Sequence, residues 1–394
     1  MSQGDLYAGR EQTLVKHFIL QKYLERFALI IGSRWQTITY VDCFSGPWNA
    51  KSENFEDSSF FIALTELRKA RDTHKTKGKT LDLRCFFLEK EPRAYRKLKA
   101  FADGIGDAEV KTKNSELTAC VGEILTFVKR GGRTSFPFIF IDPTGWTGFD
   151  LNVIAPLLSV DPGEVLINFM TGHIRRFIES PQSETQESFE RLFGSTTFRE
   201  RIQGLAHQDR EDAAILEYSE SVGKAGHYHF IAKAIVLHPE IDRTHFHLIY
   251  ATRNAKGIEV FKDVEKRAMQ VMESARAKAQ QRKRLETTRQ PDLFDSEVMR
   301  DSSYYESLRE RYLARSKKIA LDMLREGRRI RYDDLWSAAL SEPLTWESDL
   351  KGWVRYWQGA GLLILRGDET KAESPPPGRR EFPDMEDAVI VARF

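Results

Sequence analysis

Apolar runs and amphipathic segments alternate along roughly the first 170 residues of the chain. The runs at 37–44, 83–89 and 136–141 are apolar at nearly every position, whereas the segments at 11–31 and 58–70 repeat apolar residues every three or four positions. The first pattern is typical of strands that are buried on both faces, and the second of helices that cover such strands. The alternation therefore predicts an α/β fold in which helices cover both faces of a parallel sheet.

Two extended runs follow, "HYHFIAKAIVL" at 227–237 and "HFHLIYATR" at 245–253. The short "HPEIDRT" between them predicts a β-hairpin, which adds an antiparallel strand to the sheet. Each run begins with two histidines on one face of its strand, but a hairpin places the two pairs at opposite ends. A metal site is therefore not expected.

A different pattern begins at about residue 311. Three amphipathic helical segments are followed by "LLILRG" and "AVIVARF", two short apolar runs with a proline-rich loop between them. Helices followed by a two-stranded wing predict a winged helix-turn-helix domain. We therefore divide the chain into a Rossmann-like domain at 1–290, a linker at 291–310 and a winged helix-turn-helix domain at 311–394.

The composition narrows the function classes. With 41% hydrophobic and 30% charged residues, the 394-residue chain resembles a soluble globular protein. Its net charge is only +2, so any nucleic-acid surface must come from a local cluster such as the basic helix at 276–284. Cys43, Cys85 and Cys120 have neither disulfide nor zinc spacing. Without an expected membrane span or signal peptide, the chain is predicted to be cytoplasmic.

Polar residues follow the apolar runs where the strands are expected to end. Asp42 leads into "SGP", in which Gly46 lets a ligand approach the backbone closely. Glu89 ends the second run, where an acid can accept hydrogen bonds from ribose hydroxyls, and Asn114 ends the third, where an amide can face an adenine edge. Each also fits an ordinary strand end. Together they predict a nucleoside-containing cofactor, because the carboxyl ends of parallel strands form the ligand crevice of open sheets.

The strongest strand signal ends at Asp142-Pro143. Proline stiffens the step after the aspartate, whose carboxylate can accept a hydrogen bond from an amine and align its lone pair toward a methyl group. Nearby side chains are expected to contact a substrate or its phosphates, although the tryptophan also fits core packing and the cations a solvated surface. These residues are Trp146, Asn168, Arg175, Arg176, Arg282 and Lys283.

Six ordered segments within about residues 10–270 resemble the three-Cys-motif partner (TcmP) family: "YVDCFSGP", "FLEKEP", "FIDPTG", "EVLINFM", "FERLFGS" and "YATRNAKGIEVFKDV". The family resembles class I S-adenosylmethionine-dependent methyltransferases in sheet order. The resemblance implies S-adenosylmethionine as cofactor and a partner protein, of iron–sulfur or radical type, that carries the three cysteines. It implies a cofactor loop at Asp42, Phe44 and Gly46, a ribose-binding acid at Glu89 and a catalytic strand end at Asp142-Pro143.

Two positions depart from the methyltransferase pattern. Trp48 stands where such loops usually have a second glycine, and "DPTG" lacks the second proline and aromatic of the amino-methylating "DPPY". The sequence predicts a methyltransferase that acts on nucleic acid. One alternative, which Trp48 favours, is a non-catalytic partner of a three-Cys-motif protein in a mobile-element or phage defence system. Another is a winged-helix regulator that senses a nucleotide.

Overall fold

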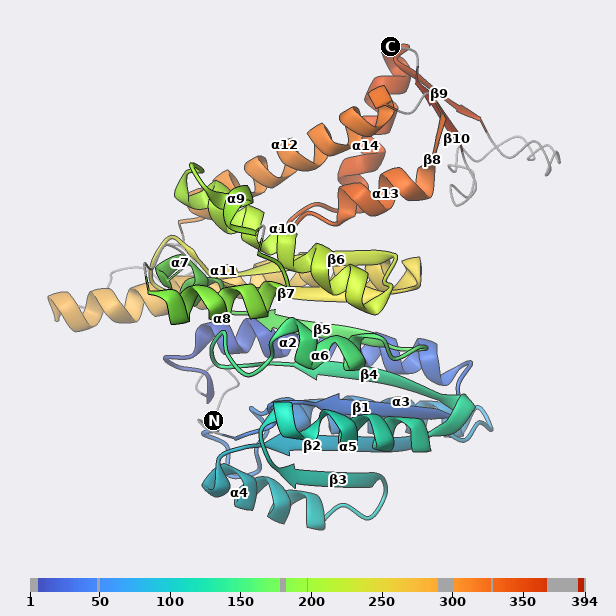
Figure 1. Ribbon diagram of the computed structural model, residues 1–394, viewed down its shortest axis with the longest axis vertical. Coiled ribbons are helices and arrows are strands. Elements are labelled where there is room, and N and C mark those ends of the chain that lie inside the picture. The colour runs from blue at the N-terminus through green and yellow to red at the C-terminus, as the bar shows by residue number, and fades with distance from the viewer. Residues whose placement is uncertain are drawn as a thin grey trace. The chain divides into compact units, whose positions relative to one another are not determined.

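The chain forms two compact units (Figure 1). The first comprises Met1–Ile231 and Ile235–Asp301, and the second comprises Ser302–Phe394 together with Ala232–Ala234. The first unit contains a seven-stranded sheet and the second a three-stranded sheet. The computed structural model describes residues 6–47, 50–177, 182–196, 198–289, 301–326, 329–366 and 389–392.

The first unit is built on one sheet with the strand order β3-β2-β1-β4-β5-β7-β6. The pairs from β3 to β5 are parallel, and β7 is antiparallel to β5. This order is typical of class I methyltransferases, so the predicted Rossmann-like sheet with an antiparallel hairpin strand is confirmed. The strands are β1 (Thr37–Asp42), β2 (Asp82–Glu89), β3 (Glu109–Asn114), β4 (Ser135–Ile141), β5 (Glu164–Phe169), β6 (Phe230–Leu237) and β7 (Thr244–Thr252).

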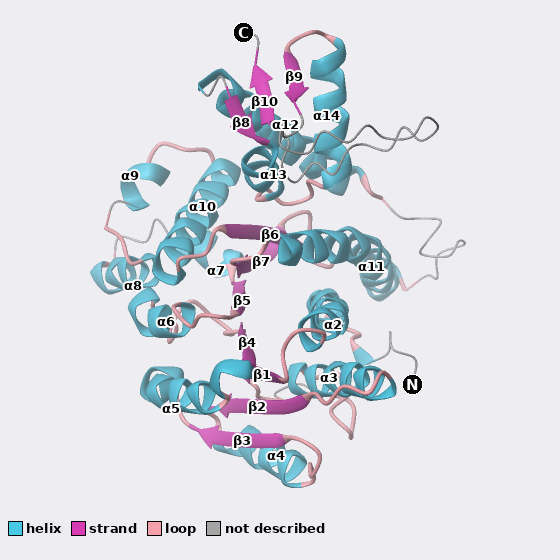
Figure 2. Ribbon diagram, turned by 90° about the vertical axis from the view of Figure 1, so that its right-hand side faces the viewer, coloured by secondary structure: helices cyan, strands magenta, loops and turns pink. Residues whose placement is uncertain are grey.

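Helices cover both faces of this sheet. Figure 2 shows α2, α3 and α11 on one face and α5, α6 and α10 on the other. The helices of the unit are α2 (Glu11–Gly32), α3 (Ser59–Thr76), α4 (Pro92–Asp103), α5 (Leu117–Arg130), the 3₁₀ turn η1 (Gly132–Thr134), α6 (Leu151–Leu158), α7 (Thr171–Phe177), α8 (Ser183–Phe193), α9 (Phe198–Ile202), α10 (His207–Gly226) and α11 (Ala255–Thr288).

The central strands are apolar because helices cover both of their faces. Every residue of β1 and β5 is buried, whereas β3, at the edge of the sheet, is partly exposed along its length. Aromatic rings fill the layer under α2, where Tyr40 and Phe138 stack with their centroids 6.1 Å apart. Close packing of this kind fixes the strand ends on which the candidate site is built.

The second unit combines three helices with an antiparallel sheet of order β8-β10-β9. The predicted pairing of "LLILRG" with "AVIVARF" is confirmed, because Leu363 pairs with Ala392 and Arg366 with Val389. Its elements are α12 (Ser303–Glu326), β8 (Arg329–Arg331), α13 (Tyr332–Leu340), α14 (Glu347–Gly359), β9 (Leu363–Arg366) and β10 (Val389–Ala392).

The predicted linker at 291–310 is too long at its carboxyl end. Residues 303–310 form the first two turns of α12, and Leu308 and Tyr312 of this helix are buried. The sequence prediction missed these turns because polar residues surround the single buried Leu308. Residues 290–300 lie outside the described part of the chain.

None of the described helices combines the length and the apolar character that crossing a lipid bilayer requires. Cys43, Cys85 and Cys120 are all free and buried.

Candidate functional site

A cleft of about 630 Å³ opens at the carboxyl ends of the central strands. Its wall is formed by the segments that follow β1, β2, β3, β4 and β5, together with residues of α2 and the starts of α3 and β7. Its volume lies within the range typical of cofactor and small-molecule sites. The predicted site residues that line it are Phe44, Gly46, Glu89, Asp142, Pro143 and Asn168.

Asp42 lies behind this wall rather than in it. Its side chain is 0% exposed, and its carboxylate accepts hydrogen bonds from Ser59 Oγ (2.6 Å) and Phe44 N–H (3.1 Å). Burial raises the pKa of Asp42 to about 6, against the lowering effect of these hydrogen bonds. Asp42 therefore fixes the turn after β1 against the start of α3, which corrects the expectation that its side chain contacts the cofactor.

Glu89 lines the cleft at the end of β2. Its side chain is 3% exposed, and its Oε1 accepts the backbone N–H of Glu91 at 2.6 Å. Glu91 is the N-cap of α4, so this hydrogen bond ties the Glu89 carboxylate to the strand-to-helix turn. A buried carboxylate that is held in this way matches the position of the predicted ribose-binding acid.

Three side chains from separate elements meet just beyond β4. Asp142 accepts hydrogen bonds from Lys16 Nζ of α2 at 2.5 Å and from Asn168 Nδ2 of β5 at 2.7 Å. The side chains of Lys16 and Asp142 are only 13% and 12% exposed, so water screens this ion pair weakly. The two donors hold the Asp142 carboxylate in one orientation in the cleft wall.

Asn168 has one buried polar atom without a hydrogen-bond partner. Its amide nitrogen must face Asp142, because a carboxylate accepts but does not donate. The Oδ1 atom is therefore left as an acceptor, and it is buried without a partner in a side chain that is 2% exposed. A buried acceptor of this kind costs free energy until a donor reaches it. Because Asn168 lines the cleft, a ligand that carries an N–H group can supply that donor.

Lys16 is a site residue that the sequence analysis did not identify. It follows the buried Val15 and precedes the buried His17 in α2, a helix whose pattern indicated only core packing. The ammonium group also lies 5.8 Å from the ring centroid of Phe246, another cleft residue. A lysine flanked by buried positions in an amphipathic helix is a weak signal, and it becomes specific only when the fold brings Asp142 to it.

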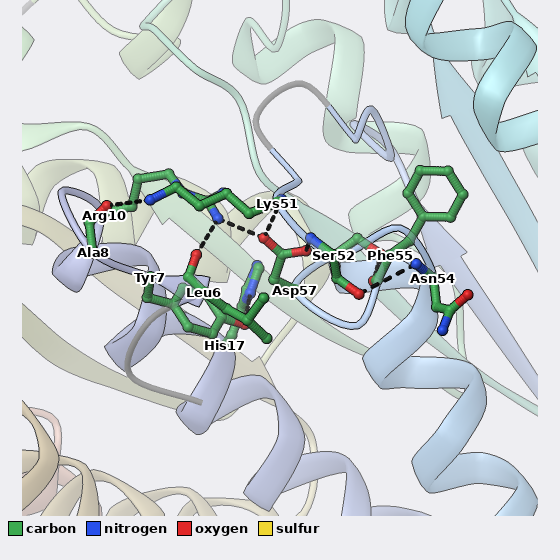
Figure 3. Close-up of polar contacts among 11 residues, drawn as sticks. Leu6, Tyr7, Ala8, Arg10, His17, Lys51, Ser52, Asn54, Phe55 and Asp57 are labelled. Atoms are coloured by element: carbon green, nitrogen blue, oxygen red, sulfur yellow. Dashed lines mark hydrogen bonds and ion pairs between the residues drawn. The ribbon is translucent and has the colours of Figure 1, made fainter. Parts of the chain in front are cut away.

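Polar contacts tie the segment before α2 to the loop before α3, and Arg10 and Asp57 of this network line the cleft (Figure 3). Arg10 donates to Asp57 Oδ2 at 2.5 Å and to the carbonyl of Leu6 at 2.8 Å. Asp57 also accepts the backbone N–H groups of Lys51 and Ser52. Burial opposes ionisation of Asp57, but these hydrogen bonds outweigh it and hold the pKa of the carboxyl below its usual value. The carboxylate therefore ties the loop before α3 to the segment before α2.

His17 borders the same cleft and is 7% exposed. Its Nδ1 is 2.9 Å from the hydroxyl of Tyr7 (Figure 3). Burial, together with the positive charges of Lys16 and Arg10, lowers the pKa of His17 to about 3. The imidazole is therefore neutral at physiological pH and adds no charge to the cleft.

Two predicted contacts lie outside the cleft wall. Asn114 is exposed, and its amide donates to the carbonyls of Glu89 and Lys90, so it joins β3 to the end of β2 instead of facing an adenine. Trp146 packs against the core and stacks on Phe189 with ring centroids 5.9 Å apart. The alternative of core packing is therefore correct for this tryptophan, because an apolar layer formed by α8 is available to it.

The predicted phosphate contacts also lie away from the cleft lining. Arg175 is held by Glu211 and by the carbonyl of Thr244, and Arg176 is exposed on α7. Arg282 pairs with Glu11 at 2.7 Å, and Lys283 pairs with Glu240 at 3.1 Å. These ion pairs neutralise much of the basic helix, which the local charge count of the sequence did not anticipate.

Two further predictions concern Trp48 and metals. Trp48 lies outside the described residues, so its relation to the cleft stays a prediction. Within the described ranges, no group of three or more His, Cys, Asp or Glu residues is arranged to hold a metal ion.

Comparisons with known proteins give distant similarities only. No family model and no curated protein matches the sequence. A solved Legionella pneumophila protein of the family DUF519 is 11% identical, with a TM-score of 0.40, over 65% of this chain and 92% of its own. Loganic acid methyltransferase with SAH is 10% identical, with a TM-score of 0.30, over 73% of this chain and 92% of its own. Similarity at this level carries no argument about activity, so the fold assignment rests on the observed strand order.

Proposed function

We propose that the first unit is an S-adenosylmethionine-dependent methyltransferase that acts on an amino group. The observation that carries the proposal is the pair formed by Asp142 and Asn168. Both side chains line the cleft, and the Asn168 Oδ1 is buried without a donor. A –NH₂ group has two hydrogens, so it can donate one to an oxygen of each side chain, which directs the nitrogen lone pair away from them.

The cleft has features that fit the proposed cofactor. Glu89 is a buried carboxylate in the cleft wall, and its proposed role is to accept hydrogen bonds from ribose hydroxyls. Gly46 lines the cleft after β1, where the absence of a side chain would let a ligand approach the backbone. S-adenosylmethionine supplies an electrophilic methyl group bonded to a sulfonium sulfur. Asp142 and Asn168 then orient the acceptor nitrogen, Lys16 holds Asp142 in place, and the proton released from the methylated amine passes to solvent.

Nucleic acid is the proposed acceptor, through an exocyclic base amine. The second unit supports this, since three helices with a three-stranded antiparallel sheet suit a winged helix-turn-helix. Its helix α14 buries Leu350, Val354 and Trp357 and leaves Tyr356 68% exposed, so a separate face is available for a partner. A three-Cys-motif protein as partner, and a role in mobile-element or defence systems, remain predictions from the TcmP resemblance.

Two measurements on the full chain test this proposal. Calorimetry should show that S-adenosylmethionine binds the wild type, that Glu89→Ala weakens the affinity about tenfold or more, and that Asp142→Asn leaves it nearly unchanged. Transfer of a tritiated methyl group to unmethylated DNA or RNA should fall about a hundredfold or more in Asp142→Asn. Absence of binding at millimolar cofactor would support the non-catalytic alternative, and wild-type transfer by Asp142→Asn would remove Asp142 from the mechanism.

A further inference from the structure

A second cavity lies between α2, α3 and α11, apart from the proposed methyl-transfer chemistry. Its volume is about 790 Å³, and it shares only His17 with the cleft at the strand ends. Its walls include the half-buried apolar side chains of Leu14, Phe18, Phe61 and Val271.

Two buried carboxylates in this cavity each have an oxygen without a donor. Glu66 is 1% exposed; its Oε1 accepts from Gln21 (2.9 Å) and Lys69 (2.8 Å), but its Oε2 has no hydrogen-bond partner. Glu11 is 6% exposed; its Oε1 accepts from Arg282 (2.7 Å), and its Oε2 likewise has no partner. Because an unsatisfied buried carboxylate oxygen is costly, both atoms favour a ligand that donates hydrogen bonds.

The two acids lie near opposite ends of the cavity floor. Gln21, which contacts Glu66, is ten residues beyond Glu11 in α2, and a helical rise of about 1.5 Å per residue separates them by ~15 Å. Leu14 and Phe18 lie between them on the same helix face, since they follow Glu11 at helical spacing. The floor is therefore acidic at both ends and apolar in the middle.

The remaining charges of the wall are compatible with a cation. Arg282 forms an ion pair with Glu11, and the oppositely charged Lys278 and Glu56 are both exposed to solvent. The polar atoms of the wall that most need a hydrogen-bond partner are therefore Glu66 Oε2 and Glu11 Oε2.

We propose that this cavity binds a linear polyamine. Its terminal ammonium groups donate to Glu66 Oε2 and Glu11 Oε2, and its methylene chain lies on Leu14 and Phe18. Lys69 and Arg282 already pair with the two carboxylates, so the ligand supplies the missing hydrogen bonds rather than the balancing charge. An ammonium group has three N–H donors for this purpose, while the hydrocarbon chain matches the apolar middle of the floor. The proposal does not depend on methyl transfer.

Calorimetry on the full chain with spermine, putrescine and Mg²⁺ tests the proposal. Spermine should bind, and putrescine, which is too short to reach both acids, should bind about tenfold more weakly or worse. Glu66→Gln should weaken spermine binding about tenfold or more. Glu25→Gln removes a partly exposed charge from α2, outside the cavity wall, and should leave the affinity within about twofold.

A second variant covers the case in which Glu66→Gln does not fold. Val271→Arg places a guanidinium in the cavity from a half-exposed position on α11 and should abolish spermine binding while Glu66 remains intact. The proposal is overturned if the wild type does not bind spermine or if Val271→Arg binds spermine normally. It is also overturned if Mg²⁺ displaces bound spermine as effectively as another polyamine does.

Discussion

Two acids lie at opposite ends of neighbouring strands: Glu164, which is buried, at the start of β5, and Asp142, whose side chain is 12% exposed, beyond the end of β4. Glu164 Oε2 accepts from Tyr23 at 2.6 Å and its Oε1 from Thr252 at 2.9 Å, and the hydroxyl of Tyr23 contacts that of Tyr250. At the carboxyl ends of the strands, Asp142 accepts hydrogen bonds from Lys16 and Asn168, but the Asn168 side-chain oxygen lacks a donor.

The two groups differ in whether the protein satisfies all of their hydrogen bonds, as it does around Glu164 but not around Asp142 and Asn168. Glu164 also borders a cavity, of about 910 Å³, yet both of its oxygens are satisfied by the protein itself. The first turn of α11 packs closely on this network, because a Cβ at Gly257 would lie 2.2 Å from the Tyr250 hydroxyl. A fully satisfied network stabilises the fold, whereas a partly satisfied one leaves binding capacity for a ligand.

The largest effect should come from removing the acid of the closed network. Glu164→Ala leaves the buried hydroxyls of Tyr23 and Thr252 without their acceptor and should lower the free energy of unfolding by about 3–5 kcal/mol. Urea denaturation measures this loss. Asp142→Asn, at the carboxyl end of β4, should lower the free energy of unfolding by no more than about 1 kcal/mol. An equal loss in both variants would contradict the distinction between the two networks.

The free energy of unfolding should depend on pH through the ionisation of Asp42. Its pKa of about 6 exceeds the ordinary value of 3.8, so its contribution is fully present below pH 3.8 and is lost as the pH rises through 6. The free energy of unfolding should therefore fall between pH 4 and 7, by up to ~3 kcal/mol from this group. Asp42→Asn should flatten that part of the profile, and an unchanged slope would contradict the assignment.

A substitution at Asn168 should lower the methyl-transfer activity more than the stability. Asn168→Leu keeps the side-chain volume but removes both the unpartnered acceptor and the amide donor to Asp142. Methyl transfer should therefore fall about 10–100-fold, while S-adenosylmethionine affinity stays within about threefold. Asn152→Leu, at an exposed position of α6, is the matched control. Loss of cofactor affinity in Asn168→Leu alone would instead place Asn168 in cofactor binding.

The smallest effect concerns the lysine that positions Asp142. Lys16→Met removes a largely buried ion pair and should lower the free energy of unfolding by about 1 kcal/mol, with a matching fall in transfer rate. Lys22→Met removes an exposed pair from the same helix and should change stability by no more than a few tenths of a kcal/mol. If the two variants behave alike, burial of the Lys16 pair has no special role.

The sheet could be predicted from the sequence because its strands are apolar on both faces and end in polar residues. The same signal located Glu89 and Asp142, whose places follow from strand ends. It could not show that Asp42 is buried behind the wall or that Asn114 joins two strands, since both depend on where each loop turns.

The contacts from distant parts of the chain were beyond the sequence pattern. Lys16 meets Asp142 across 126 residues, and Arg282 meets Glu11 across 271. A helical pattern identifies the buried face of α2 or α11 but not the charge that will lie opposite each lysine or arginine. For this reason the basic helix at 276–284 was expected to be free for phosphate, although several of its cations have carboxylate partners.

The place of Lys16 in α2 has a consequence for synthesis of the protein. The ribosome makes this lysine before any strand of the sheet, and Asp142 follows only 126 residues later. A nascent chain that stops short of β4 therefore carries the helix and its ammonium group without their carboxylate partner. Completion of the proposed catalytic centre must wait until the fourth and fifth strands have joined the sheet.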